Sequence, residues 1–133
     1  AARQLERVRT LLRNAPIMIN AAYSTPELGA ALGRPPNSDH LQGHSVDFTA
    51  PAFGDAYAIA QAIAASPEIM AEVDQLIFEN GRWVHISFAP QRRGQILTSH
   101  YRPETGRRLN FVEGIRRVDS NGQLIEAQQQ AAP

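Results

Sequence analysis

The stretch "DQLIFENGRWVHISF", residues 74–88, predicts a β-hairpin and with it the class of the fold. Two apolar runs flank Asn80-Gly81, a dipeptide that strongly favours a tight turn between antiparallel strands. Outside this hairpin, segments with a helical pattern come early in the chain and segments with a strand pattern come late. That order favours an α+β fold, with a central antiparallel sheet and two or three helices packed on it.

The other elements follow from local sequence patterns. "RQLERVRTLLR" repeats apolar residues at helical spacing, and "GDAYAIAQAIAA" is rich in alanine, the best helix former. "IMINAAY" is short and apolar, so we expect a buried strand there. We expect helices over residues 3–13, 24–33 and 54–65, and further strands over residues 17–23, 44–50, 95–102 and 107–115.

Composition narrows the possible functions. The 133 residues fit one domain, expected over residues 1–126, followed by a mobile polar tail over 127–133. The 13 basic residues, all arginine, balance 13 acidic residues, which argues against nucleic acid or an anionic membrane as the main partner. The chain has no cysteine, so histidine, aspartate or glutamate would have to hold any metal. No apolar run reaches membrane-span length, and the N-terminal residues lack the order of a signal peptide.

The stretch "SDHLQGHSVDF", residues 38–48, concentrates two of the four histidines. His40 and Asp47 can meet if the loop doubles back at Gly43 and enters a strand whose polar face carries Asp47. His85, in the middle of the hairpin's second strand, is the best third ligand. Two histidines and one aspartate would leave a fourth position for water, which is the pattern of catalytic zinc. The alternatives are a polar surface loop at His40 and a buried, hydrogen-bonded structural histidine at His85.

These residues resemble the signature of a peptidase family, the zinc D-alanyl-D-alanine carboxypeptidases and L-alanyl-D-glutamate endopeptidases. The family pattern is Ser-x-His-x-x-Gly-x-x-x-Asp followed by Trp-x-His on a later strand. The matching residues are Ser38, His40, Gly43, Asp47, Trp83 and His85. The resemblance covers roughly residues 3–98. It implies the fold shared with the hedgehog signalling domain, and the family includes many phage-borne peptidoglycan peptidases.

The resemblance also implies roles for individual residues. His40, Asp47 and His85 would hold Zn²⁺, which would activate a water molecule and polarise the scissile carbonyl. Ser38 would shape the loop or support the ligands, and Trp83 would form a wall of the cleft unless it is ordinary packing. The implied partner is a peptidoglycan stem peptide, the implied place of action is the bacterial cell wall or periplasm, and we expect a monomer.

Two positions depart from the family pattern. The family has an arginine in a Tyr-Arg-Ser-Pro turn, where it steadies a substrate carboxylate or the developing oxyanion, and Ser24 stands at that position here. Loss of one oxyanion donor costs on the order of 100- to 1000-fold in rate. Arginines that could substitute, or could simply be solvated, are Arg34, Arg82, Arg92 and Arg93.

The second departure concerns the general base. Many relatives have a glutamate three residues before the last ligand, where this chain has Arg82. Glu79 lies six residues before His85, the offset at which the hedgehog domain has its metal-adjacent glutamate. A two-residue turn would pair Glu79 with Arg82 and turn it away from His85. A three-residue connection would pair Glu79 with Trp83 and put both on the face of His85, and we expect this register.

We therefore expect a zinc peptidase that cuts peptidoglycan stem peptides, with Glu79 as the general base. The alternative is a catalytically weak or inactive zinc-binding module with a structural or cell-wall-binding role in a phage particle. The set of three ligands favours the peptidase, and the serine at position 24 favours the module.

Overall fold

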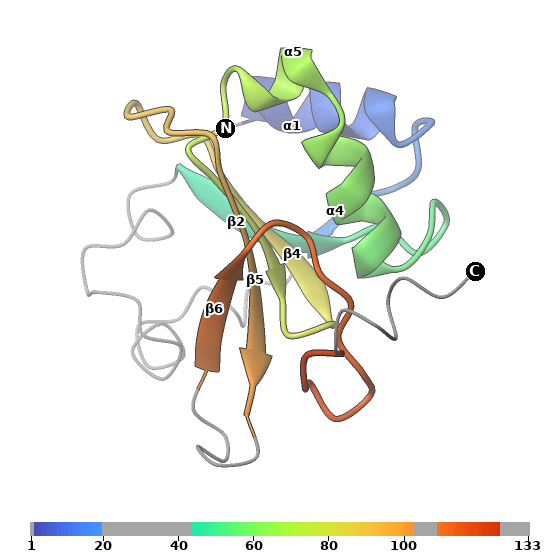
Figure 1. The fold of residues 1–133 in the computed structure, drawn as a ribbon. Helices are drawn as coiled ribbons and strands as arrows, with labels where there is room; N and C mark the ends of the chain where they lie inside the picture. The colour runs from blue at the N-terminus through green and yellow to red at the C-terminus, as the bar shows by residue number, and fades with distance from the viewer. Residues whose placement is uncertain (1, 20–43, 103–108, 126–133) are drawn as a thin grey trace.

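The computed structural model describes residues 2–19, 44–102 and 109–125, and these form a mixed α+β fold. Three helices lie together against a twisted sheet (Figure 1). The helices are α1 (Ala2–Leu11), α4 (Ala56–Ala64) and α5 (Pro67–Met70). The strands are β1 (Met18–Ile19), β2 (Ser45–Thr49), β3 (Gln75–Glu79), β4 (Trp83–Ser87), β5 (Gln95–Tyr101) and β6 (Leu109–Glu113).

The strand order in the sheet is β1-β2-β4-β3-β5-β6. The expected all-antiparallel sheet is wrong in one pairing, because β5 lies beside β3 and runs parallel to it. The chain leaves β4 and crosses the start of β3. There the Asp74 amide donates to the Ser87 carbonyl and the Gln95 amide donates to the Asp74 carbonyl. Strand β4 therefore serves as the connection between the two parallel strands.

The hairpin predicted over residues 74–88 forms with the three-residue connection. Glu79 pairs with Trp83. Asn80 and Gly81 have φ of 56° and 76°, a left-handed conformation that asparagine and glycine tolerate best. The amide of Arg82 donates to the carbonyl of Glu79 at 2.9 Å and closes the turn.

The two faces of the sheet differ in chemistry because strand side chains alternate. One face, called here the helix face, carries Phe48, Leu76, Phe78, Val84 and Ile86 and forms the core with the helices. The opposite face, called here the polar face, carries Asp47, Glu79, His85 and Ser99. These four side chains are nonetheless buried.

Helices α1 and α4 form where the sequence pattern predicts helices, whereas α5 was not expected, and the starts of α4 and α5 have local causes. Val8 and Leu12, on one stripe of the N-terminal segment, are fully buried. The Asp55 carboxylate accepts from the Ala58 amide at the start of α4, and the Ser66 hydroxyl accepts from the Ile69 amide at the start of α5. An ion pair between Arg7 and Glu72 links α1 to the chain just after α5.

The expectation of a buried strand over residues 17–23 is wrong about burial at Met18 and Ile19. Among the described residues, strand β1 is Met18–Ile19, and these side chains are 56% and 54% exposed. An edge strand has a neighbour on one side only, so an apolar sequence there does not ensure burial. The helix expected over 24–33 and the tail expected over 127–133 lie outside the described residues.

The segment after β6 closes over the tip of the hairpin and the start of α4. The Arg117 guanidinium lies 4.5 Å from the centroid of the Tyr57 ring, a favourable cation–π contact. The amide of Tyr101 donates to the carbonyl of Gly122, which is buried against Asn80. In the parts of the chain described here, no helix is both long and apolar enough to cross a bilayer.

Candidate active site

A carboxylate and an imidazole meet on the polar face of the sheet. Asp47 lies opposite His85 in the antiparallel pair of β2 and β4. Nδ1 of His85 is 2.9 Å from Oδ1 of Asp47. The Asp47 side chain is fully buried, and that of His85 is 5% exposed. The expectation that Asp47 points away from the core is confirmed, since Val46 and Phe48 on either side of it pack into the core.

The chemistry of this pair fits a divalent transition metal. Zinc takes imidazole nitrogen and carboxylate oxygen as ligands, and two such atoms on a tetrahedral ion stand roughly 3.3 Å apart. The separation of 2.9 Å between Nδ1 and Oδ1 is close to that value. The same contact is also a complete hydrogen bond, the arrangement expected of a structural histidine. Both alternatives from the sequence are therefore compatible with this geometry.

The third expected ligand, His40, lies outside the described residues, as does Ser38. Among residues 2–19, 44–102 and 109–125, no group of three histidine, aspartate or glutamate side chains could hold a metal ion. The described residues thus contribute two neighbouring donors, Asp47 and His85.

Glu79 lies on the same face as this pair. It ends β3 and pairs with Trp83, and His85 is two residues further along β4. Glu79 and His85 are therefore diagonal neighbours on two strands, with a separation of about 7–8 Å between backbones. A glutamate side chain and one water molecule span such a gap. Glu79 is only 2% exposed, so few water molecules compete for its carboxylate.

Trp83 stands on the polar face beside Glu79 and is 7% exposed. The indole is therefore packed into the protein rather than presented to solvent. This burial agrees with either alternative for Trp83, a wall of the cleft or ordinary packing.

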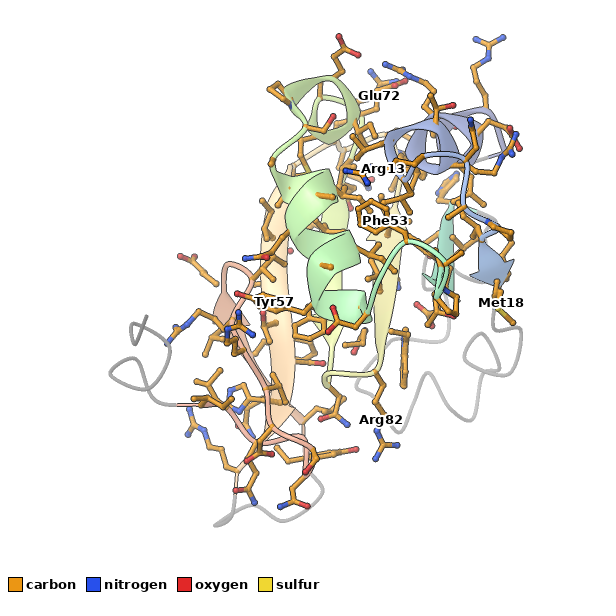
Figure 2. All side chains as sticks on the ribbon, turned by 90° about the vertical axis from the view of Figure 1, so that its right-hand side faces the viewer. Arg13, Met18, Phe53, Tyr57, Glu72 and Arg82 are labelled. Carbon is orange, nitrogen blue, oxygen red and sulfur yellow. The ribbon has the colours of Figure 1, made fainter. Side chains whose placement is uncertain are left out.

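The candidate substitutes for the family arginine lie in different parts of the fold. Arg82 is exposed and extends from the hairpin tip, away from the sheet (Figure 2). Arg92 is exposed in the connection between β4 and β5. Ser24 and Arg34 lie outside the described residues.

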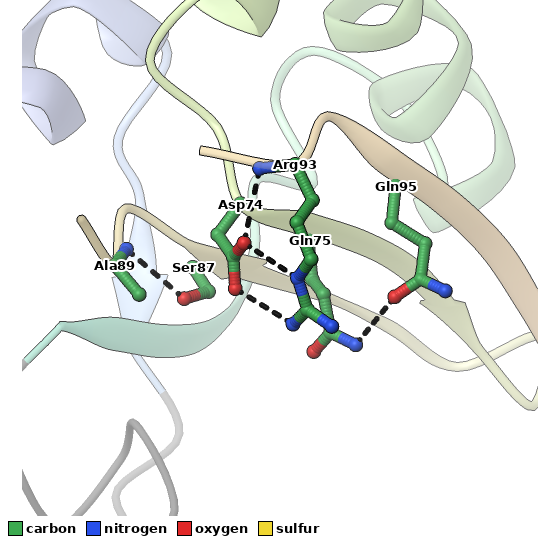
Figure 3. A network of polar contacts seen from close by, with 6 residues as sticks. All are labelled: Asp74, Gln75, Ser87, Ala89, Arg93 and Gln95. Carbon is green, nitrogen blue, oxygen red and sulfur yellow. Dashed lines mark hydrogen bonds and ion pairs between the residues drawn. The ribbon is translucent and has the colours of Figure 1, made fainter. Parts of the chain in front are cut away.

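Arg93 makes a bidentate ion pair with Asp74. Its Nε and Nη2 donate to the two carboxylate oxygens at 2.8 and 2.9 Å, and its backbone amide donates at 3.1 Å (Figure 3). The hydrogen bonds from the Arg93 side chain hold the pKa of Asp74 below its usual value, although burial acts in the opposite direction. This pair fixes the connection that crosses the start of β3.

The two remaining histidines are not part of this pair. His44 immediately precedes β2 and is partly buried. His100 is buried on β5, next to Ser99 along the strand, so it belongs to the helix face.

Ser99 is a polar-face residue that the sequence did not single out. Its hydroxyl donates to Oε2 of Glu79 at 2.9 Å. The contact depends on the parallel pairing of β3 with β5, which sets Glu79 opposite Ser99. Alternation within "QILTSHY" tells which residues share a face of that strand, but not which strand lies beside it.

Comparison with known proteins connects this chain to a peptidase family. The family model described as Peptidase M15 matches residues 1–87. The matched residues include Asp47, Glu79, Trp83 and His85. No curated protein and no solved structure matches the chain.

Proposed function

The chain belongs to the Peptidase M15 family, and from this premise we propose that it is a zinc-dependent peptidase that cleaves peptidoglycan stem peptides. One observation carries the proposal. Two strands bring the Asp47 carboxylate and the His85 imidazole to 2.9 Å on a buried polar face, and Glu79 shares that face. A buried carboxylate and imidazole beside a second buried carboxylate are the groups that metal-assisted hydrolysis requires.

The proposed zinc ligands are Asp47 and His85, together with His40. When bound, zinc would act as a Lewis acid that lowers the pKa of a water molecule and polarises the scissile carbonyl. The protein's own contribution is orientation. Asp47 and His85 sit on adjacent central strands, and ladder hydrogen bonds fix their backbones.

Glu79 is the proposed general base. It would take the proton of the attacking water and pass it to the leaving amine. A general base must reach that proton directly or through one water molecule, and its place diagonal to His85 meets this requirement. Trp83, beside Glu79, would exclude solvent from that side of the site.

The alternative function is a zinc-binding module with little or no activity, which would bind the cell wall or have a structural role in a phage particle. The serine at position 24 favours it, because a serine cannot supply the positive charge of the family arginine. The ion pair of Arg93 with Asp74 also favours it, since that guanidinium already serves the fold.

The same proposal includes a hedgehog-like topology, a monomeric state and action at the bacterial cell wall or periplasm.

The test combines metal analysis with digestion of purified peptidoglycan. The wild type should bind one zinc ion and release peptide fragments, and a chelator should stop the release. Glu79→Gln should keep its zinc and lose about 100-fold or more in rate, because only proton transfer is removed. His85→Ala should lose the zinc itself.

Glu113→Gln is the matched control, since it removes an exposed carboxylate from β6 on the same face. It should retain both zinc and activity. Wild-type protein that pellets with insoluble peptidoglycan but never cleaves it would support the alternative. Full activity of Glu79→Gln would exclude Glu79 as the base.

A further inference from the structure

A buried serine holds the carboxylate of Glu79. The Ser99 hydroxyl donates to Oε2 of Glu79 at 2.9 Å, and the two residues are 0% and 2% exposed. A hydrogen bond to a carboxylate is roughly twice as strong as one between neutral groups, and water does not compete at this exposure. The bond therefore restricts the three side-chain torsions of Glu79.

The backbone around Ser99 is also fixed. Strands β3 and β5 pair in parallel with Glu79 opposite Ser99. Just beyond Glu79, the Asn80 amide donates to the Ser99 carbonyl at 3.0 Å. The serine is thus anchored by the backbone of the same hairpin that carries Glu79, so its hydroxyl has little freedom relative to the carboxylate.

The residue type at position 99 stands out from its neighbours on that face. Leu97 and Tyr101, two residues away on either side, are an aliphatic and an aromatic residue. A hydroxyl between them is costly to bury without a partner, and Glu79 is the partner it has. Ser99 also lies beyond residues 1–87, so the family match assigns it no role.

We propose that Ser99 is a positioning residue that orients the Glu79 carboxylate for proton transfer. The proposal rests on the proposed role of Glu79 as the general base. Ser99 itself need not touch the substrate. Its effect is to keep one oxygen engaged and the carboxylate plane fixed, so that the base needs less reorganisation during the reaction.

The test compares Ser99→Ala, Ser99→Cys and Ser99→Thr in the full chain loaded with zinc. Alanine removes the donor, cysteine keeps the volume but is a weak donor, and threonine retains the hydroxyl on a β-branched side chain suited to a strand. Ser99→Ala and Ser99→Cys should lose about 10-fold in kcat, the scale of a lost hydrogen bond to a charged group, with KM nearly unchanged. Ser99→Thr should recover most of the rate.

Ser87→Ala is the matched control. Ser87 is also buried, but its hydroxyl accepts from the Ala89 amide. It should lose a similar amount of stability without the loss in kcat. Equal kcat losses in Ser87→Ala and Ser99→Ala would overturn the inference, because they would indicate a general effect on folding.

The double variant Ser99→Ala with Glu79→Gln separates the two proposals. If Ser99 acts through Glu79, the double variant should be no slower than Glu79→Gln alone. A further 10-fold loss would show that Ser99 acts independently and would overturn the inference while leaving Glu79 as the base. Full activity of Glu79→Gln would overturn both.

Crystal structures of the variants give a readout that does not depend on activity. The Glu79 side chain should occupy one rotamer in the wild type and in Ser99→Thr, and several in Ser99→Ala. A single unchanged rotamer in Ser99→Ala would overturn the inference. A wild type that shows this ordering but cleaves no peptidoglycan would instead count against the proposed function.

Discussion

Asp74 is a buried residue at the start of β3 that is bonded to β4 and β5 and to the connection between them. Its backbone bonds to the ends of β4 and β5, and its side chain accepts three hydrogen bonds from Arg93. Hydrogen bonding to the charged form of a carboxylate lowers its pKa, and here that effect outweighs the cost of burial. The ion pair therefore stabilises the connection from β4 to β5.

The substitution Asp74→Asn should lower the free energy of unfolding by about 2–3 kcal/mol at pH 7, because it removes charge-assisted hydrogen bonds. The folded pKa of Asp74 is lowered, so the wild type's advantage is complete above the ordinary value of 3.8 and is lost as the pH falls below it. Denaturant titrations from pH 7 to pH 3 measure this difference.

Glu113→Gln, which alters an exposed carboxylate on β6, is the control and should show no such loss. A difference between wild type and Asp74→Asn that stays constant down to pH 3 would contradict the assignment.

At the scale of elements, the hairpin tip and the segment after β6 depend on each other. The tip presents Asn80 in a left-handed conformation, and Gly122 packs directly against it with φ of 78°. A Cβ on Gly122 would lie 2.8 Å from Cδ2 of Tyr101 and closer still to Oδ1 of Asn80. The same tip carries Glu79, so packing here also supports the proposed site.

Two glycine substitutions separate strain from overlap. Gly94 has φ of 65° but no atom near its missing Cβ, so Gly94→Ala should cost only about 1–2 kcal/mol of backbone strain. Gly122→Ala adds steric overlap and should cost about 2–4 kcal/mol in total. Thermal unfolding of both variants gives the comparison, and equal losses would show that the tip relaxes freely.

At the scale of the whole molecule, the two faces of the sheet have different roles. The helix face with its three helices forms the apolar core, whereas the polar face holds the buried site residues. Because the core does not include Asp47 or His85, the fold should persist without metal. Zinc would then stabilise an already folded protein by binding only the native state.

Zinc added to metal-free protein should therefore raise the free energy of unfolding by about 2.7 kcal/mol at a free concentration 100 times its Kd. The metal-free protein should still unfold in one cooperative transition by circular dichroism. His85→Ala should unfold cooperatively but show no response to zinc. An equal response of His85→Ala, or loss of cooperative unfolding on chelation, would contradict the division between the two faces.

Local patterns in the sequence predicted α1, α4 and strands β2 to β6, and which residues share a face within a strand. The apolar stripe with Val8 and Leu12 predicts α1, and alternation separates Asp47 from Phe48. Asn80-Gly81 predicts the turn but fits either register, and the pairing of Glu79 with Trp83 shows that the three-residue connection forms. These predictions succeeded because helical and strand periods are properties of neighbouring residues along one chain.

Only the tertiary structure decided which strands lie side by side. Strand β5 pairs with β3 rather than continuing an antiparallel meander from β4, and this choice brings Ser99 to Glu79 and Arg93 to Asp74. The order of the strands also places β1 at an edge of the sheet, where its apolar side chains are exposed. No local period encodes such pairings, because they depend on how distant segments pack into one core. The sequence around a serine or an arginine also does not show whether its side chain faces solvent or a buried carboxylate.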